Sequence, residues 1–180
     1  MKQLKTERLI LREWQESDFE SVHAYASVME NVQYMLFGPN TEEQTKAFLE
    51  RSIAKYSEDP VTDFVFAVEL RNTNQVIGGC EITMVNDHEA SLGWILHRDY
   101  WKKGYGTDLA NELIRFGFEE LKCHRIYASC DSDNYGSYRV MERNNMRREA
   151  HFVENRKHRG EWRDEFIYAI IEDEWNQIHS

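Results

Sequence analysis

The turn at residues 101–107 reads Trp101-Lys102-Lys103-Gly104-Tyr105-Gly106-Thr107 and joins an apolar run that ends near Leu96 to a helical pattern that begins near Thr107. Glycine has no Cβ atom, so backbone N–H groups in this turn can approach an anion closely. The helix N-terminus adds about half a positive charge, and Lys102 and Lys103 add two more cations. These features favour a pyrophosphate site, and a glycine-rich turn that only reverses the chain is the equal alternative.

Spacing excludes two common phosphate loops. A P-loop needs the pattern GxxxxGK[ST], which the chain lacks, and a dinucleotide fingerprint needs a third glycine where Leu109 stands. With 9 glycines in 180 residues, a Gly-x-Gly triplet also occurs by chance, so the triplet alone decides nothing. The prediction depends on the position of the turn between a strand and a helix.

Apolar patterns on both sides of the turn indicate a single domain over residues 1–180. Before the turn, β-rich runs separated by turn residues predict an antiparallel meander at 64–70, 76–85 and 90–96. After it, the apolar residues of the segment 107–121 recur at the spacing of one helix face.

The rest of the chain completes an α+β pattern. A Ser17-Asp18 cap and a capping box formed by Thr41 and Gln44 mark two helix starts. The other expected elements are strands at 9–11, 126–130, 146–153 and 166–171, and helices at 17–26, 41–56 and 134–143. We predict a mixed, mostly antiparallel sheet with helices on both faces.

Charge is unevenly distributed. The chain carries 22 basic and 32 acidic side chains, and this net charge of −10 weighs against nucleic-acid binding, which depends on Lys and Arg at phosphates. Residues 1–90 hold 8 basic and 16 acidic side chains, whereas residues 139–163 hold 8 basic and 4 acidic ones. An anion site is therefore expected in the second half, and a cationic ligand suits the first; a solvated charged surface is the plain alternative.

Cysteine usage and the N-terminus favour a cytoplasmic protein. The three cysteines form no CxxC pair, and an odd count fits poorly with a disulfide framework. The first eight residues, Met1 to Arg8, have no apolar signal-peptide core, and no stretch approaches the roughly 20 apolar residues of a membrane span. None of the 7 histidines has metal-ligand spacing, so no metal is expected.

Three separated motifs resemble the GNAT acyltransferases, and in particular their RimJ/RimL branch. The first is Gly93-Trp94-Ile95-Leu96 followed by residues 100–107, which is similar to the acetyl-CoA signature of that family. The second is the opening segment 6–12, Thr-Glu-Arg-Leu-Ile-Leu-Arg, followed by Trp14. The third is the segment 134–143, whose Asn134 and Ser137 match an Asn-x-x-Ser helix. The resemblance covers residues 6 to about 171.

This resemblance implies a GNAT-like fold and the transfer of an acetyl group from acetyl-CoA to an amine by direct attack in a ternary complex, without a metal. The strand before the turn would diverge from its neighbour, and its backbone would pair with the pantetheine arm and polarise the thioester carbonyl. The implied cofactor-binding residues are Trp94, Ile95 and Leu96 on the strand, Lys102, Lys103, Gly104, Tyr105, Gly106 and Thr107 at the pyrophosphate, Asn134 at the pantetheine, and Arg139 or Arg143 at the adenosine-side phosphates.

The general base is the part of the pattern that this chain changes. Relatives often carry a glutamate two residues before the glycine of the signature strand, where this chain has Ser91. Glu89 lies two residues earlier and, by strand alternation, on the same face, so it could act directly or through water. Glu81 on the neighbouring strand is the second candidate, and a solvent-facing role is its alternative.

The general acid has two candidates. Ser137 occupies the serine of the Asn-x-x-Ser pattern, and Tyr138 follows it with a better-matched acidity, because a phenol has a pKa near 10. Either hydroxyl could protonate the departing thiolate. A helix-surface serine and a core tyrosine are the plain alternatives.

The acceptor is expected to be an amine. At pH 7, deprotonating an α-amine costs about 1 kcal/mol and deprotonating a lysine about 4.6 kcal/mol, so a weak base suffices for the former. A protein N-terminus of the ribosomal type is the first expectation, and a small polyamine or an aminoglycoside equally suits the acidic first half. A non-catalytic CoA-binding module is the alternative raised by Ser91, and an RNA-associated protein is the weakest one.

Aromatic residues leave a further question open. Trp14, Trp162 and Trp175 could line an acceptor groove or a homodimer contact, and packing in the core is the default for each.

Overall fold

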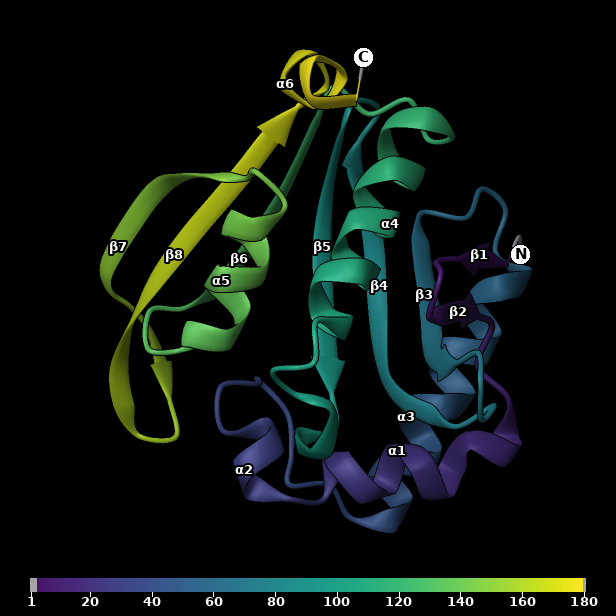
Figure 1. The fold of residues 1–180 in the computed structure, drawn as a ribbon. Coiled ribbons are helices and arrows are strands. Elements are labelled where there is room, and N and C mark those ends of the chain that lie inside the picture. Colours follow the sequence, from purple (N-terminus) through teal and green to yellow (C-terminus); the bar gives the residue numbers. More distant parts are fainter. Residues whose placement is uncertain (1–2, 180) are drawn as a thin grey trace.

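The computed structural model describes residues 3–179, which form one eight-stranded sheet in the order β1-β2-β3-β4-β5-β6-β8-β7 with helices on both faces (Figure 1). The strands are β1 Leu4–Lys5, β2 Leu9–Arg12, β3 Asp63–Leu70, β4 Val76–Asn86, β5 Glu89–Leu96, β6 Arg125–Asp131, β7 Arg147–His158 and β8 Glu161–Ile171. The helices are α1 Phe19–Ala26, α2 Met29–Val32, α3 Glu42–Ala54, α4 Tyr105–Glu119, α5 Tyr135–Arg143 and α6 Glu172–His179. The α+β prediction and the antiparallel meander β3-β4-β5 are confirmed.

Met1 and Lys2, which begin the N-terminal stretch considered above, and Ser180 lie outside the described residues. Within residues 3–179, no helix combines the length and the apolar character that crossing a bilayer takes.

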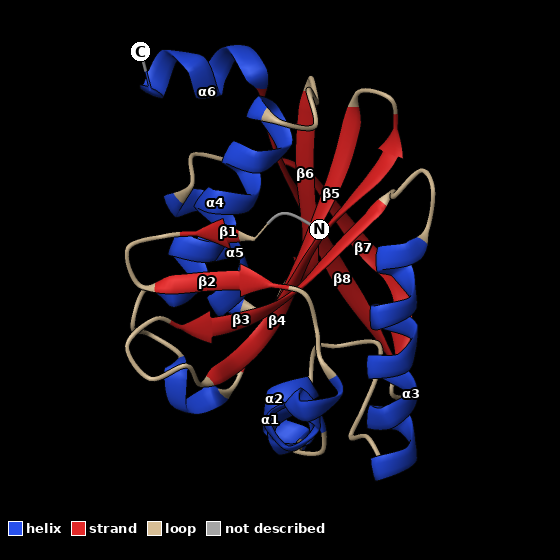
Figure 2. Cartoon of the chain, turned by 90° about the vertical axis from the view of Figure 1, so that its right-hand side faces the viewer, coloured by secondary structure: helices blue, strands red, loops and turns tan. Residues whose placement is uncertain are grey.

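The core has two parts, one on each face of the sheet (Figure 2). On one face α4 buries Leu109, Leu113 and Phe116 against the sheet, as their spacing predicts, and α5 adds Met141. On the other face α1 and α3 pack around the buried Trp14. The sheet therefore separates two compartments that could each take a different ligand.

The decisive irregularity lies between β5 and β6, the parallel pair among the described strands. Their pairing runs from Glu89 opposite Arg125 to Leu92 opposite Ala128 and stops there. Beyond that point β5 continues to Leu96, whereas β6 continues to Asp131 and pairs only with β8. The edge of β5 that faces β6 is thus left without a strand partner over residues 93–96, and its N–H and C=O groups need other partners.

Several boundaries differ from the sequence predictions. Helix α4 begins at Tyr105 rather than near Thr107, because Gly104 caps it in the left-handed region with φ 84°. The Ser17-Asp18 cap is replaced by a 3₁₀ turn, Glu16–Asp18, and the carboxylate of Asp18 instead binds the Arg12 guanidinium at 2.8 Å. The Thr41 and Gln44 capping box is confirmed.

The hairpin β7–β8 is much longer than the predicted strands at 146–153 and 166–171. Arg159 and Gly160 form its two-residue turn, with φ values of 49° and 91°. The strands continue through charged residues, so the apolar pattern that predicts a strand is missing there. The same reason applies to α6, whose first turn holds Glu172, Asp173 and Glu174 and which the sequence did not predict.

Gly78 allows β4 to approach the diverging end of β5. A Cβ atom at Gly78 would lie 2.1 Å from the carbonyl oxygen of Ile95, a backbone atom that cannot turn away. We expect Gly78→Ala to lower the free energy of unfolding by about 3 kcal/mol through overpacking. The control is Gly136→Ala in α5, where the nearest atom to a new Cβ is 3.7 Å away, so the free energy of unfolding should stay unchanged or rise by up to about 1 kcal/mol. Urea denaturation measures both, and equal stability of the two variants would contradict the expectation.

Candidate functional site

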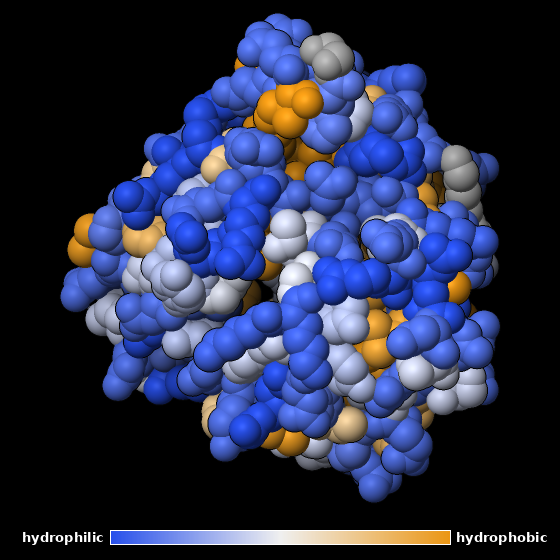
Figure 3. All heavy atoms as spheres, in the orientation of Figure 1, coloured by the Kyte–Doolittle hydropathy of each residue, from blue (hydrophilic) through white to orange (hydrophobic). Residues whose placement is uncertain are grey.

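A cleft of about 480 Å³ opens where β5 leaves β6. Its walls come from four segments: α2 with the residues after it, the end of β5, the turn at 100–107, and the first turns of α5. The cleft opens left of centre on the face shown in Figure 3. Of the sequence-predicted cofactor residues, the structure brings the following to this cleft: Trp94, Ile95, Leu96, Lys102, Gly104, Tyr105, Gly106, Thr107, Asn134, Arg139 and Arg143.

The turn at 102–107 presents the N-terminus of α4 to the cleft. The first N–H groups of a helix have no intrahelical partner, so those of Tyr105, Gly106 and Thr107 face this end. A Cβ at Gly106 would meet Cγ2 of Val140 at 3.0 Å, so glycine lets α4 and α5 approach each other here. The ammonium of Lys103 lies 5.3 Å from the ring centre of Tyr100 beside the turn.

Arg8, which directly precedes β2, stabilises this turn. Its guanidinium donates hydrogen bonds to the carbonyl oxygen of Lys103 at 2.9 Å and to the carboxylate of Asp108 at 2.7 Å. The guanidinium carbon also lies 4.6 Å from the ring centre of Tyr105. The sequence analysis did not assign Arg8 a role; its signal was its place in the opening motif at residues 6–12.

The end of β5 is held by two side chains. The carbonyl oxygen of Leu96 accepts hydrogen bonds from Nδ2 of Asn31 at 2.9 Å and from Nε1 of Trp101 at 2.8 Å. The Oδ1 atom of Asn31 accepts a hydrogen bond from the backbone N–H of Arg98 at 3.3 Å, so both the nitrogen and the oxygen of this buried amide are hydrogen-bonded. Asn31 lies in a helix of only four residues, and nothing in the local pattern pointed to it.

Helix α5 supplies the opposite wall. Asn134 caps the helix, because its Oδ1 accepts from the N–H of Ser137 at 3.1 Å, and its amide nitrogen remains for the cleft. The side chain of Ser137 lies within hydrogen-bonding reach of the buried Cys130, and burial raises the pKa of that thiol to about 12. Ser137 lines the cleft, whereas the ring of Tyr138 packs into the core at 5.8 Å from that of Phe166.

Two arginines of α5 differ in their pairing. The Arg139 guanidinium donates to Glu142 at 2.6 Å, and this contact raises the pKa of Arg139 further. Within residues 3–179 no hydrogen bond or ion pair engages the side chain of Arg143. Arg143 is therefore the cation of this wall that an incoming anion meets without competition.

The two candidate bases lie at different levels of β5: Glu81, on the neighbouring strand β4, stands opposite Gly93, whereas Glu89 is the first residue of β5. Glu81 on β4 pairs with Gly93, and a Cβ at Gly93 would meet its Oε1 at 2.9 Å. Its carboxylate therefore covers the first unpaired residue of β5, on the face opposite α4. Glu81 remains accessible to water, yet the surrounding protein atoms desolvate it and raise its pKa; Lys55 lowers the pKa and Asp63 raises it.

Glu89 lies at the other end of β5, where that strand is still paired with β6. Its carboxylate accepts a hydrogen bond from Arg125, which in turn donates to Glu149 at 2.5 Å. Asn86 donates to the other carboxylate oxygen of Glu89 at 3.4 Å. Neither Glu81 nor Glu89 is among the residues that line the cleft.

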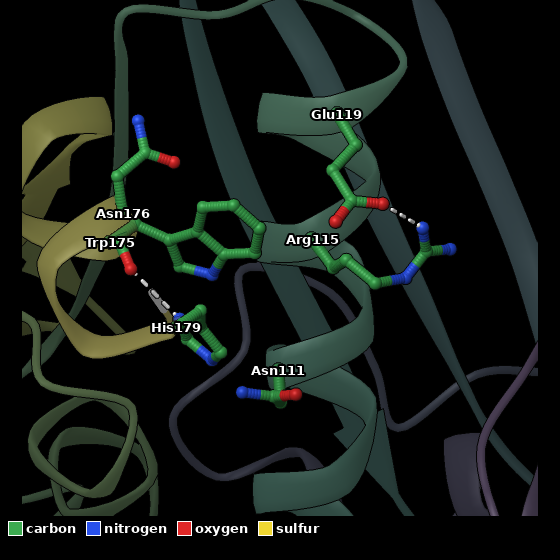
Figure 4. A pocket seen from close by; sticks show the side chains of 6 residues that line it. All are labelled: Asn111, Arg115, Glu119, Trp175, Asn176 and His179. Atoms are coloured by element: carbon green, nitrogen blue, oxygen red, sulfur yellow. Dashed lines mark hydrogen bonds and ion pairs between the residues drawn. The ribbon is translucent and has the colours of Figure 1, made fainter.

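A second hollow of about 510 Å³ lies between α4 and α6, away from every predicted site residue (Figure 4). Its Arg115 is already engaged by Glu112 at 2.7 Å and Glu119 at 2.5 Å. Trp175 lines this hollow and stacks on His179, Trp14 is buried, and Trp162 is exposed on β8. In the part of the chain that the structure describes, no cluster of His, Cys, Asp and Glu is arranged to hold a metal.

Comparisons with known proteins identify acetyltransferases as relatives of this chain. Residues 8–147 match the acetyltransferase (GNAT) domain family. The uncharacterized N-acetyltransferase YnaD of Bacillus subtilis is 36% identical over 96% of this chain and 99% of its own length. The crystal structure of a GNAT-family acetyltransferase from Bacillus anthracis is 36% identical, covers 96% of this chain and 100% of its own, and superposes with a TM-score of 0.87.

Two more distant structures show the fold alone. RimL, a ribosomal L7/L12 α-N-protein acetyltransferase in complex with CoA, is 19% identical, with 96% and 99% of the two chains covered and a TM-score of 0.83. The spermidine N-acetyltransferase of Vibrio cholerae with CoA and spermine is 22% identical, with 95% and 99% covered and a TM-score of 0.80.

The chain belongs to the GNAT family of acetyltransferases and is an acetyl-CoA-dependent N-acetyltransferase. The cleft fits acetyl-CoA on its own evidence. Free N–H groups and Lys102 at the α4 turn suit a pyrophosphate, and Arg143 suits a further phosphate. The unpaired edge of β5 suits the amide groups of a pantetheine arm.

We expect Arg8→Ala to weaken CoA binding about fivefold, which corresponds to the loss of about 1 kcal/mol from one hydrogen bond that shapes the turn. Isothermal titration with CoA measures the change. The control is Arg71→Ala, which removes hydrogen bonds to the carbonyl oxygens of Thr6 and Glu7 and leaves the turn at 102–107 untouched. An equal loss of affinity in both variants would show that Arg8 acts only through the opening strand.

Proposed function

We propose that this acetyltransferase moves the acetyl group onto a primary amine, most favourably a protein N-terminal α-amine, by direct attack in a ternary complex. The observation that carries the proposal is the unpaired end of β5, which one cleft joins to the cationic turn at 102–107. The acetyl donor supplies an activated thioester, and the protein has to orient it, accept a proton from the amine and return one to the leaving thiolate.

The cofactor side of the proposal follows the cleft. The N–H groups of residues 102–107 hold the pyrophosphate, and Arg143 binds a phosphate on the adenosine side. The N–H and C=O groups of Trp94 and its neighbours Ile95 and Leu96 face the pantetheine, while the amide nitrogen of Asn134 donates to it from the other wall. Because strand groups alternate in direction, an N–H of this edge also points at the thioester carbonyl and can polarise it.

Glu81 is the general base in this proposal. It lies over Gly93, where the strand becomes free, and desolvation raises its pKa, which makes the carboxylate a stronger proton acceptor than an exposed one. It also stands on the face opposite α4 and α5, so the amine and the acetyl donor approach from different sides. Glu89, held by Arg125 at the paired end of β5, is the weaker candidate.

Ser137 is the general acid in this proposal, because its hydroxyl reaches the cleft and the ring of Tyr138 turns into the core. The thiolate of CoA is a good leaving group, so a weakly acidic hydroxyl, or water ordered by it, is sufficient to protonate it. Tyr138 would then act by packing against Phe166 and fixing the helix.

An α-amine is favoured over a lysine because Glu81 is a single carboxylate, and the smaller deprotonation cost of an α-amine matches such a base. The RimJ/RimL likeness of the motifs supports the same choice. The acidic character of residues 1–90 supports the alternative in which the acceptor is a polyamine. A cytoplasmic location belongs to the proposal and is supported by three buried cysteines without a disulfide.

The experiment that tests the function supplies acetyl-CoA with a panel of peptides bearing free N-termini, spermidine and an aminoglycoside, and follows the release of free CoA. We expect turnover with the peptides, and acetylation of the α-amine in their mass spectra. Turnover with spermidine and not with the peptides would contradict an α-amine acceptor and favour a small polyamine as the substrate. Tight CoA binding without turnover of any amine would favour the non-catalytic CoA-binding module.

We expect Glu81→Gln to lower kcat by about 100-fold, because general-base catalysis contributes on that scale. In the wild type, kcat/KM should fall as the pH drops through the raised pKa of Glu81, in addition to the fall caused by protonation of the acceptor amine, and the variant should lose only the part that follows Glu81. The folded state disfavours the ionised carboxylate, so above that pKa the variant should be at least as stable as the wild type.

The matched control is Glu89→Gln, which loses the Arg125 ion pair and should keep the wild-type rate and pH profile. If Glu89→Gln removes that part of the pH dependence and Glu81→Gln does not, the base is Glu89.

A further inference from the structure

Residues 29–38, called here the bridge, are attached to both sides of the diverging strands. The bridge contains α2 and the residues up to Gly38. On one side Asn31 holds the end of β5 through the carbonyl oxygen of Leu96. On the other side the turn of the β7–β8 hairpin, His158 to Gly160, contacts the bridge backbone. Figure 1 shows α2 at the lower end of the molecule, between the end of β5 and the hairpin.

Arg159 makes most of the hairpin contact. One nitrogen of its guanidinium, Nη2, donates to the carbonyl oxygens of Val32 at 3.2 Å, Phe37 at 3.3 Å and Gly38 at 2.8 Å. The Nε2 atom of His158 lies 2.9 Å from the carbonyl oxygen of Gln33. These bonds tie the two ends of the bridge loop together and to the hairpin.

The residue type at the hairpin turn indicates that the contact between Arg159 and the bridge is important. A two-residue hairpin turn with both φ values positive favours Asn, Asp or Gly at its first position. Arg159 occupies that position with a φ of 49°, at a cost in local conformational energy. The hydrogen bonds from Arg159 to three carbonyl oxygens offset the cost of placing this residue at a position that favours Asn, Asp or Gly.

The region between the diverging strands, called here the window, is bounded by the bridge. The last β5–β6 pair, Leu92 opposite Ala128, bounds the window at one end, and the bridge bounds it at the other. The sides are the free end of β5 and the end of β6, beyond which lies the β7–β8 hairpin. The turn at 102–107 and α5 lie with the cofactor cleft, whereas Glu81 faces the opposite compartment. An amine that enters beside Glu81 must meet the thioester in this window.

We propose that Arg159 is a positioning residue for acetyl transfer: it latches the bridge to the hairpin and so sets the width of the window through which the acceptor amine reaches the thioester. This inference rests on the proposed function and deepens it. The bridge residues Gln33, Tyr34 and Met35 line the cleft, so their position depends on the latch. A window of fixed width would discriminate by the bulk beside the amine, so we expect an N-terminal Gly to enter more readily than a branched N-terminal residue.

Three variants separate the latch from the stability of the hairpin. Arg159→Asn installs a residue that the turn prefers and removes the contacts, so the hairpin should stay folded. Arg159→Lys keeps the charge and places three donor hydrogens on one nitrogen, so it can retain part of the contact. Lys157→Ala, which removes an exposed cation two residues away on the same hairpin, is the control.

The first measurement is hydrogen exchange of residues 29–38 with and without CoA. We expect about tenfold faster exchange in Arg159→Asn than in the wild type and Lys157→Ala, because the bridge loses the contacts that keep it closed, and a rate between these two in Arg159→Lys. Exchange at the wild-type rate in Arg159→Asn would overturn the latch. This readout judges the latch even in a protein without turnover, whereas wild-type turnover alone judges the proposed function.

The second measurement is steady-state kinetics with peptides whose N-terminal residue is Gly or Val. In Arg159→Asn we expect the acceptor KM to rise about tenfold, the Kd for CoA to stay within twofold, and the preference for the Gly peptide over the Val peptide to fall, since misplacement by about 1 Å costs on this scale. An acceptor KM and a selectivity equal to those of the wild type would also overturn the proposal. A parallel rise of the CoA Kd would show a merely structural role.

Discussion

The rest of the structure depends on the divergence of β5 from β6 after Leu92 and Ala128. A strand inside a sheet normally satisfies its N–H and C=O groups on both edges, and an unpaired edge in the interior costs free energy unless other donors and acceptors reach it. Here Asn31 and Trp101 satisfy the carbonyl of Leu96, and Trp94, Ile95 and Leu96 line a cleft. The fold thus carries an incomplete sheet at the position where an extended ligand can complete it.

In the proposed function, charge placement lets the two faces of the sheet bind ligands of opposite sign. The cations Lys102 and Arg143 and the start of α4 lie on the cleft side, while Glu81 lies on the opposite face of the sheet. A net charge of −10 therefore does not describe either site, because screening in salt limits the reach of each charge to about 10 Å. The sheet itself keeps the two environments apart and lets them meet only where its strands separate.

The bridge and the hairpin, which form the proposed acceptor side, are joined by contacts between residues distant in the chain. Arg159 and Phe37 are far apart in sequence, and so are Asn31 and Leu96. Each pair joins a backbone carbonyl to a side-chain donor, so the loop loses a specific anchor when that donor is removed. A cleft with one wall held in this way can be rigid where the phosphates bind and adjustable where the acceptor enters.

Local patterns in the sequence were enough for the α+β class, the β3-β4-β5 meander, the face of α4 and the turn at 102–107, because each depends on residue periodicity or on glycine over a short stretch. The roles of Arg8, Asn31 and Arg159 could not be predicted, because each acts through a carbonyl or carboxylate that only the folded chain brings near. The same holds for the choice between Glu81 and Glu89: both alternate correctly along their strands, and only strand pairing places Glu81 over Gly93 and Glu89 at the far end with Arg125. Sequence determined which groups are present and on which face each one stands, and tertiary structure decided which of them meet, because their meeting depends on where two strands part.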